Sequence, residues 1–188
     1  MAWVIWLTGL PGSGKTTIAH ALLDLIDTSQ PVELLRLDAF RKRIIPSPSY
    51  TEEERDMVYN ALGVMADLLH SHGVNVVVDA TAHRKKWRDR ARACIDQFHE
   101  VYVKCPLDIC MERESQRTDD LIVRDMYRKA LERKRIQEKG NSAPDYDVGE
   151  VIGIDVPYEE PDHPELIIET DTVSAREGAH IIYEMLHG

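Results

Sequence analysis

The feature that most constrains this chain is a glycine-rich segment that follows an apolar run near the N-terminus. The run covers residues 3–8, and apolar residues at helical spacing follow the segment over residues 15–26. The segment itself reads Gly9-Leu10-Pro11-Gly12-Ser13-Gly14-Lys15-Thr16. It fits the pattern GxxxxGK[ST], and a strand before it with a helix after it is the context that this pattern requires. The sequence therefore predicts a phosphate-binding loop, here called the phosphate loop, between a buried strand and a helix.

The residue types of the phosphate loop suit a bound nucleoside triphosphate. Gly12 and Gly14 allow backbone angles at which successive N–H groups point at phosphate oxygens. The following helix adds the positive end of its dipole. We expect Lys15 to bridge the β- and γ-phosphates, Thr16 to bind Mg²⁺ and Thr17 to reach the α-phosphate. The loop thus predicts ATP and Mg²⁺ as cofactors, with Lys15 accessible to phosphate and outside the core.

The rest of the chain alternates between strand-like and helix-like segments. Further strands are predicted over residues 32–37, 74–78, 100–104 and 166–169, and helices over 85–98, 107–117 and 174–186. A longer helix begins after Thr51, where Glu54 completes a capping-box pattern, and ends at Gly73. Its predicted core-facing residues are Val58, Leu62, Met65, Leu68 and Leu69. This alternation predicts one α/β domain over residues 1–188, a parallel sheet covered by helices.

The segment over residues 118–164 departs from this pattern. It begins as a basic helix and ends in a stretch rich in glycine, proline and aspartate. The basic residues of its first half are Arg124, Arg128, Lys129, Arg133, Lys134 and Arg135. Such a long loop in a compact domain is usually functional, and in a phosphotransferase it predicts a lid. Its cations could neutralise the transition state, although a solvated basic helix face is the alternative.

Two aspartates follow predicted strands. Asp38 is expected at the end of the second strand and Asp79 at the end of the third. Ligands gather at the carboxyl ends of parallel strands, so either residue could hold magnesium or accept the proton of an acceptor hydroxyl. The alternative is that each caps the helix after it. His83 is expected at a helix start facing water, with an acid or base role as the less favoured interpretation, and Trp87 is expected to face the core.

Composition narrows the choice of partners and compartment. The 33 acidic and 23 basic residues give a net charge of −10, which argues against a nonspecific nucleic-acid binder. The N-terminal apolar run is too short for a membrane span or a signal peptide, so we expect no membrane partner. Three cysteines without a metal-binding spacing indicate buried thiols in a reducing cytoplasm. These features favour a cytoplasmic protein that acts on a small molecule.

Several motifs along nearly the whole chain resemble those of the adenylylsulfate kinases. They are the phosphate loop, Leu37-Asp38-Ala39-Phe40-Arg41, Tyr50-Thr51-Glu52-Glu53-Glu54-Arg55, Arg84, Cys105-Pro106-Leu107-Asp108-Ile109-Cys110 and Gly153-Ile154-Asp155-Val156-Pro157-Tyr158-Glu159-Glu160-Pro161. The last is the most specific, because it has no general role in proteins with a phosphate loop. The resemblance implies transfer of the ATP γ-phosphoryl group to the 3′-hydroxyl of adenosine 5′-phosphosulfate in sulfate assimilation. It also implies five parallel strands in the order 2-3-1-4-5.

The resemblance further implies roles for individual residues. Asp38 falls on the catalytic aspartate, and we assign magnesium to Asp38 together with Thr16, with Lys15 and Asp79 as further catalytic residues. Arg113 falls on an arginine near the ATP adenine. The residues assigned to the acceptor are Asp38, Arg41, Tyr50, Arg55, Thr81, Lys129 and Ile154. Members of this family often form dimers, so a homodimer is a further expectation, although no residue pattern marks an interface.

The chain also departs from the family pattern on the acceptor side. Arg36 stands where the family carries a second acidic residue, and Val151 replaces one of two aromatic rings that would hold the acceptor adenine. Residues 78–84 look more like those of polynucleotide-kinase-type enzymes. We therefore predict a kinase that acts on adenylylsulfate, and keep open a kinase of the same fold for another nucleotide-like, hydroxyl or amine acceptor. A nucleotide-binding regulatory ATPase is the alternative from a different class.

Overall fold

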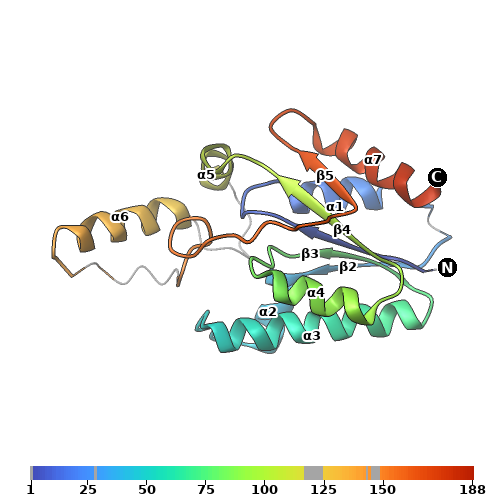
Figure 1. Ribbon diagram of the computed structural model, residues 1–188, viewed down its shortest axis with the longest axis horizontal. Coiled ribbons are helices and arrows are strands. Elements are labelled where there is room, and N and C mark those ends of the chain that lie inside the picture. Colours follow the sequence, from blue (N-terminus) through green and yellow to red (C-terminus); the bar gives the residue numbers. More distant parts are fainter. Residues whose placement is uncertain (1, 28, 117–124, 143, 145–148) are drawn as a thin grey trace.

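The computed structural model describes residues 2–27, 29–116, 125–142, 144 and 149–188. Its centre is a parallel sheet of five strands, β1 (Val4–Thr8), β2 (Val32–Arg36), β3 (Asn75–Asp79), β4 (Phe98–Lys104) and β5 (Leu166–Glu169). Their spatial order is β2-β3-β1-β4-β5, as Figure 1 shows, which confirms the predicted order. The helices are α1 (Lys15–Leu23), α2 (Leu37–Ile44), α3 (Glu52–Ser71), α4 (Lys85–Cys94), α5 (Leu107–Ser115), α6 (Met126–Glu138) and α7 (Ala175–His187).

Helices cover both faces of the sheet, and the central strands β1 and β3 are buried along their whole length (Figure 1). Successive side chains of β1 point to opposite faces because the side-chain period of a strand is two. Val4 and Trp6 pack in the core beneath α3 and α4, whereas Ile5 and Leu7 pack in the core beneath α1 and α7. A continuous apolar strand is therefore consistent with a sheet that is covered on both sides.

The strand register brings three chain segments to one edge of the sheet. Leu7 of β1 and Arg36 of β2 both pair with Asp79 of β3. The phosphate loop follows β1 directly, so it lies at the same edge. This parallel register therefore places Asp79 next to the start of α1.

The structure corrects the predicted surroundings of Asp38. The second strand ends at Arg36, and residues 37–44 form α2, a helix that the sequence pattern did not predict. Asp38 consequently lies in the first turn of α2 and not at the end of a strand. The buried apolar Leu37 prolongs the strand-like run in the sequence, which explains the error.

Three smaller predictions are also wrong. The helix predicted over residues 85–98 ends at Cys94, because Ile95 is extended and Phe98 already begins β4. On α3 the side chains of Met65 and Leu68 are exposed, since Val58, Leu62 and Ala66 form the stripe that faces the core. Of the three cysteines, Cys105 and Cys110 are buried as expected, but Cys94 is exposed.

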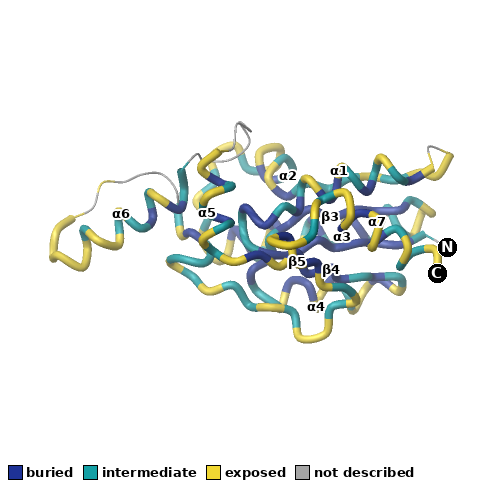
Figure 2. The backbone as a smooth tube through the Cα atoms, turned by 90° about the horizontal axis from the view of Figure 1, so that it is seen from above, coloured by how far each residue is buried: buried dark blue, intermediate teal, exposed yellow. Residues whose placement is uncertain are grey.

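Helix α6 carries the basic part of the predicted lid and extends away from the sheet (Figures 1 and 2). Its first turns pack into a small apolar cluster that contains Tyr127 and Ala130 of α6 with Cys110 of α5. The Tyr127 hydroxyl donates a hydrogen bond of 2.8 Å to the carbonyl of Pro11 in the phosphate loop. The base of the helix is thus attached to the phosphate loop, while most of its last two turns face solvent (Figure 2). Arg124 lies outside the described residues.

No helix among the described residues has the length and apolar character to cross a membrane.

Candidate active site

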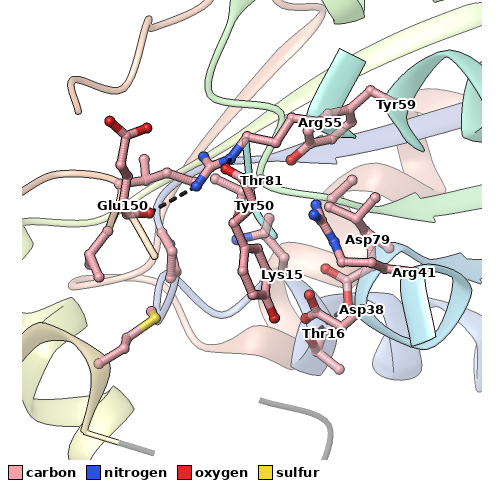
Figure 3. A pocket seen from close by; sticks show the side chains of 16 residues that line it. Lys15, Thr16, Asp38, Arg41, Tyr50, Arg55, Tyr59, Asp79, Thr81 and Glu150 are labelled. Carbon is pink, nitrogen blue, oxygen red and sulfur yellow. Dashed lines mark hydrogen bonds between the residues drawn. The ribbon is translucent and has the colours of Figure 1, made fainter. Parts of the chain in front are cut away.

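A cavity of about 140 Å³ opens at the carboxyl edge of β1, β2 and β3. The predicted site residues that line it are Pro11, Lys15, Thr16, Asp38, Arg41, Tyr50, Arg55, Asp79 and Thr81. They come from the phosphate loop, α1, α2, α3, the end of β3 and the segments after β3 and before α3. Figure 3 shows most of these side chains around the cavity. We call this cavity the acceptor pocket. Nine of the 16 residues that line the cavity were therefore predicted from the sequence as site residues.

The phosphate loop has the backbone geometry that its glycines were predicted to provide. Gly12 has a φ of 89° and Gly14 a φ of 101°, both in the region that side chains disfavour. A Cβ atom at Gly12 would lie 2.3 Å from the carbonyl oxygen of Cys110, so the loop also needs glycine there for close packing. Ser13 Oγ is buried and has no hydrogen-bond partner among the described residues. A polar cradle at the N-terminus of α1 suits a bound anion.

Lys15 is not accessible as the sequence predicted. Its side chain is buried, and its Nζ atom donates hydrogen bonds to the carbonyls of Gly9 at 3.0 Å and Leu10 at 2.9 Å. The sequence predicted an accessible lysine because the pattern says nothing of the loop's own carbonyls. The ammonium group nevertheless lines the acceptor pocket. It is therefore held at the phosphate loop beside the space where a phosphate chain would lie.

Thr16 and Asp79 form the contact most relevant to a metal ion. The Thr16 hydroxyl donates a hydrogen bond of 2.7 Å to Asp79 Oδ2, and Arg36 Nε lies 3.7 Å from the same oxygen. Mg²⁺ usually takes one or two protein ligands and keeps several waters. Among the described residues there is no cluster of three or more His, Cys, Asp or Glu side chains that could hold a metal. The pair Thr16–Asp79 fits the sparse ligand set of a magnesium ion bound with a nucleotide.

Asp38 lines the same pocket as this pair, as Figure 3 shows, and it is exposed. The surrounding protein still displaces much of its water, and this desolvation raises the pKa of Asp38. The negative charge of Asp79 raises that pKa further, while Lys15, Arg41 and Arg36 partly oppose the shift. A carboxylate with a raised pKa is a better proton acceptor than an ordinary aspartate. The position and chemistry of Asp38 therefore suit a base that serves an acceptor hydroxyl.

The acceptor side of the pocket is built around Tyr50 and two arginines. Arg55 Nε donates to the Tyr50 carbonyl and Arg55 Nη2 to the Glu150 carbonyl, both at 2.9 Å (Figure 3). The Arg41 guanidinium carbon lies 5.0 Å from the centre of the Tyr50 ring. Val151, which stands at the position of the missing aromatic ring, is buried and also lines the pocket. The Tyr50 ring and the two guanidinium groups thus border the same part of the pocket.

Outside the phosphate loop and α1, three predicted site residues do not line the acceptor pocket. Lys129 is half-buried on α6, and Ile154 packs against the apolar cluster at the base of that helix. Arg113 donates to the Thr170 hydroxyl at 3.1 Å and to the Thr170 carbonyl at 2.7 Å, so here it braces the segment after β5. Their predicted contacts with ligands remain predictions. Thr17 is exposed on α1, next to the pocket residue Thr16.

Several residues that line the pocket were not predicted from the sequence, namely Leu37, Tyr59, Ala80, Met126, Glu150 and Ile152. Tyr59 is buried, accepts a hydrogen bond of 2.9 Å from the Ala82 amide and stacks on Trp87 at 4.2 Å. Its helical spacing on α3 indicates only that it faces inward. Only the approach of α3 to the end of β3 could reveal that it borders the pocket.

His83 does not face water as predicted. It is buried, with its ring edge against Trp87 at 5.0 Å. Burial lowers the pKa of His83 to about 3, and the nearby charges of Arg55 and Arg84 act in the same direction. The ring is therefore neutral near pH 7, and it lies outside the residues that line the pocket. Trp87 is buried as expected.

Comparison with known proteins shows the family of this chain. The family model for adenylylsulphate kinase matches residues 1–169. The chain belongs to the adenylylsulfate kinase family. The probable adenylyl-sulfate kinase of Archaeoglobus fulgidus is 36% identical over 172 residues, which are 91% of this chain and 97% of that protein. The adenylyl-sulfate kinase of Rippkaea orientalis is 35% identical over 186 residues, which are 97% of this chain and 90% of that protein.

A solved structure supports the same family. It is the APS kinase of Mycobacterium tuberculosis in complex with AMPPNP and APS, with a TM-score of 0.80 and 26% identity. The comparison covers 100% of this chain and 98% of that chain. An adenylylsulfate kinase is an ATP-dependent phosphotransferase, so the enzyme class predicted from the phosphate loop is confirmed. The predicted family and fold are confirmed with it.

Proposed function

We propose that this chain transfers the γ-phosphoryl group of ATP to the 3′-hydroxyl of adenylylsulfate and so forms 3′-phosphoadenylylsulfate. The observation that carries the proposal is the match of residues 1–169 to the adenylylsulfate kinase family. The geometry is consistent with this match, because Asp38, Arg41 and Arg55 line one pocket together with Lys15. Phosphoryl transfer needs mainly alignment and charge neutralisation, and these residues can supply both.

The donor end of the site lies at the phosphate loop. Its backbone N–H groups and Lys15 would bind the β- and γ-phosphates of ATP. Thr16 and Asp79, already joined by a hydrogen bond, would hold Mg²⁺, which supplies charge neutralisation on the phosphate oxygens when bound. We therefore assign the metal to Asp79 together with Thr16 in place of Asp38, and keep the acceptor as the main partner of Asp38.

On the acceptor side, Asp38 aligns the attacking hydroxyl and accepts its proton. Its raised pKa favours this role at neutral pH without the need for a separate base. The guanidinium groups of Arg41 and Arg55 would bind the phosphosulfate charges, because arginine matches such anions with several donors. The Tyr50 ring would stack on the acceptor adenine, as aromatic rings do on nucleobases.

The proposed function predicts acceptor-dependent release of ADP. We expect adenylylsulfate to stimulate ADP release from ATP far more than AMP, adenosine, sulfate or a 5′-hydroxyl oligonucleotide does. A coupled assay with each acceptor at equal concentration measures this directly. Greater stimulation by another member of the panel would reject adenylylsulfate as the acceptor and would give the substitution at Val151 a functional meaning. Slow ATP hydrolysis without any acceptor effect would instead favour a regulatory ATPase.

A second prediction concerns α6 as part of a lid over residues 118–164. Closure of a lid excludes water and completes the site once both substrates are bound. Amide hydrogen exchange over Met126–Glu138 should therefore slow when a non-hydrolysable ATP analogue and adenylylsulfate are both present. Exchange in the buried strand β1 serves as the control and should stay the same. Identical exchange in α6 with and without ligands, in a sample shown to bind them, would contradict the lid.

A further inference from the structure

Glu54 is a buried carboxylate whose partners all belong to the acceptor side of the site. Its Oε1 accepts a hydrogen bond of 2.6 Å from Arg41 Nη1 on α2. Its Oε2 accepts from the Ser49 hydroxyl at 2.8 Å, from the Tyr50 amide at 3.1 Å and from the Ser49 amide. A buried charge is costly unless it is paired and hydrogen-bonded, and Glu54 has four donors from two separate segments. These donors lower the pKa of Glu54 although its burial alone would raise it.

The sequence predicted a smaller role for this carboxylate. In a capping box, Glu54 would reach back to the amide of Thr51. The structure shows only one half of that motif, since the Thr51 hydroxyl accepts from the Glu54 amide at 3.2 Å. The carboxylate itself reaches past the helix end to Ser49, Tyr50 and Arg41. The Glu54 carboxylate therefore joins α3 to α2 and to the segment before α3.

Tyr50 is the residue that most needs these contacts. Its φ of 56° lies in the left-handed region, which residues other than glycine occupy only where the surrounding structure holds them. The Tyr50 amide is held by Glu54 and the Tyr50 carbonyl by Arg55. Glu54 also holds the guanidinium of Arg41, which packs against the Tyr50 ring. One carboxylate thus fixes both the ring and the cation that line the acceptor pocket.

We propose that Glu54 is the positioning residue of the acceptor site, and that it sets the affinity for the nucleotide-like acceptor without touching it. Glu54 does not line the acceptor pocket, whereas Arg41 and Tyr50 do. Its effect must therefore pass through them. The phosphate loop shares none of the four hydrogen bonds, so the affinity for ATP does not depend on Glu54. This inference rests on the proposed function, because it takes adenylylsulfate as the acceptor.

The Glu54→Gln variant tests the proposal, since it keeps the shape but removes the charge and turns one acceptor atom into a donor. Hydrogen bonds to a charged group are stronger than neutral ones, and we expect KM for adenylylsulfate to rise about tenfold or more. KM for ATP and kcat should change less than about twofold, the pattern expected when binding is lost equally in the ground state and the transition state. Glu53→Gln is the matched control. It removes the same charge from the exposed neighbouring position and should leave both KM values unchanged.

A second measurement separates positioning from a loss of folding. The amides of Ser49 and Tyr50 should exchange hydrogen faster in Glu54→Gln, while exchange in β1 and β3 stays the same. Ser49→Ala removes a single donor from an exposed residue and should raise KM for adenylylsulfate by about two- to fivefold, so it replaces Glu54→Gln if that variant does not fold. Equal loss of ATP and acceptor affinity, or no change in either, overturns the proposal.

The two proposals fail in different ways. If the wild-type protein does not use adenylylsulfate, the proposed function is wrong, and the comparison is repeated with the acceptor that the panel identifies. A selective rise in KM for that acceptor still supports the role of Glu54. Unchanged KM for the acceptor in Glu54→Gln, with wild-type turnover present, overturns that role alone.

Discussion

Replacing Lys15 with alanine should lower turnover by at least about 10²-fold while the fold stays intact. In the proposed function its ammonium group is the cation beside the transferred phosphoryl group, and loss of one positioned charge-stabilising donor costs about 10²–10³-fold in kcat. Its Nζ atom donates hydrogen bonds to two carbonyls of the phosphate loop itself, those of Gly9 and Leu10, so the change acts mainly on this loop. ADP release with saturating acceptor measures the turnover, and thermal unfolding checks the fold.

Lys86→Ala is the matched control for this change. Lys86 is exposed on α4, where it pairs with Glu52 and Asp56, and it does not line the acceptor pocket. Its loss should leave turnover near the wild-type value. A Lys15→Ala protein that keeps more than a tenth of wild-type turnover would show that the phosphate loop has been assigned the wrong role.

The second large effect is expected at Asp38. Asp38→Asn keeps the shape of the side chain but removes its charge and its basicity, and general-base contributions are about 10²–10⁴-fold. Turnover should fall by that order while the affinity for ATP changes little. The loss should depend on pH. The raised pKa of Asp38 means that wild-type turnover declines as the pH falls through a value above that of an ordinary aspartate, where the carboxylate becomes protonated.

Asp79→Asn is the natural comparison for Asp38→Asn because the two aspartates line the same pocket. The Asp79 carboxylate accepts a hydrogen bond from the Thr16 hydroxyl, so loss of the Asp79 charge should mainly weaken the binding of Mg²⁺. For Asp79→Asn we expect a milder loss of turnover, a higher Mg²⁺ requirement and the same decline of turnover at low pH as in the wild type. Asp38→Asn should lose that decline. Titrations of pH and Mg²⁺ with both variants measure these differences. If Asp79→Asn shows the greater loss of turnover, the roles of the two aspartates are exchanged.

Local patterns in the sequence were enough to predict the phosphate loop and the class of the fold. The loop is one contiguous segment whose glycines and lysine act through their own backbone and their immediate neighbours, so its residue types carry the information. The same holds for β1, a buried strand that is apolar at every position except Thr8. The strand order and the enzyme family came from resemblance in several motifs, and the structure and the comparisons confirm them.

Side-chain partners were decided only by the tertiary structure. Nothing local to Asp38 shows that α2 begins beside it, and nothing local to Lys15 shows which atoms its ammonium group meets. The sequence pattern of Glu54 indicated a helix cap, yet its carboxylate binds Arg41, 13 residues away along the chain. These contacts depend on how the segments pack at the sheet edge, since hydrogen bonds between distant residues form only after the chain has brought them together. The residue types of the phosphate loop could therefore be predicted from the sequence, whereas the contacts among the residues of the acceptor pocket depend on the folded protein.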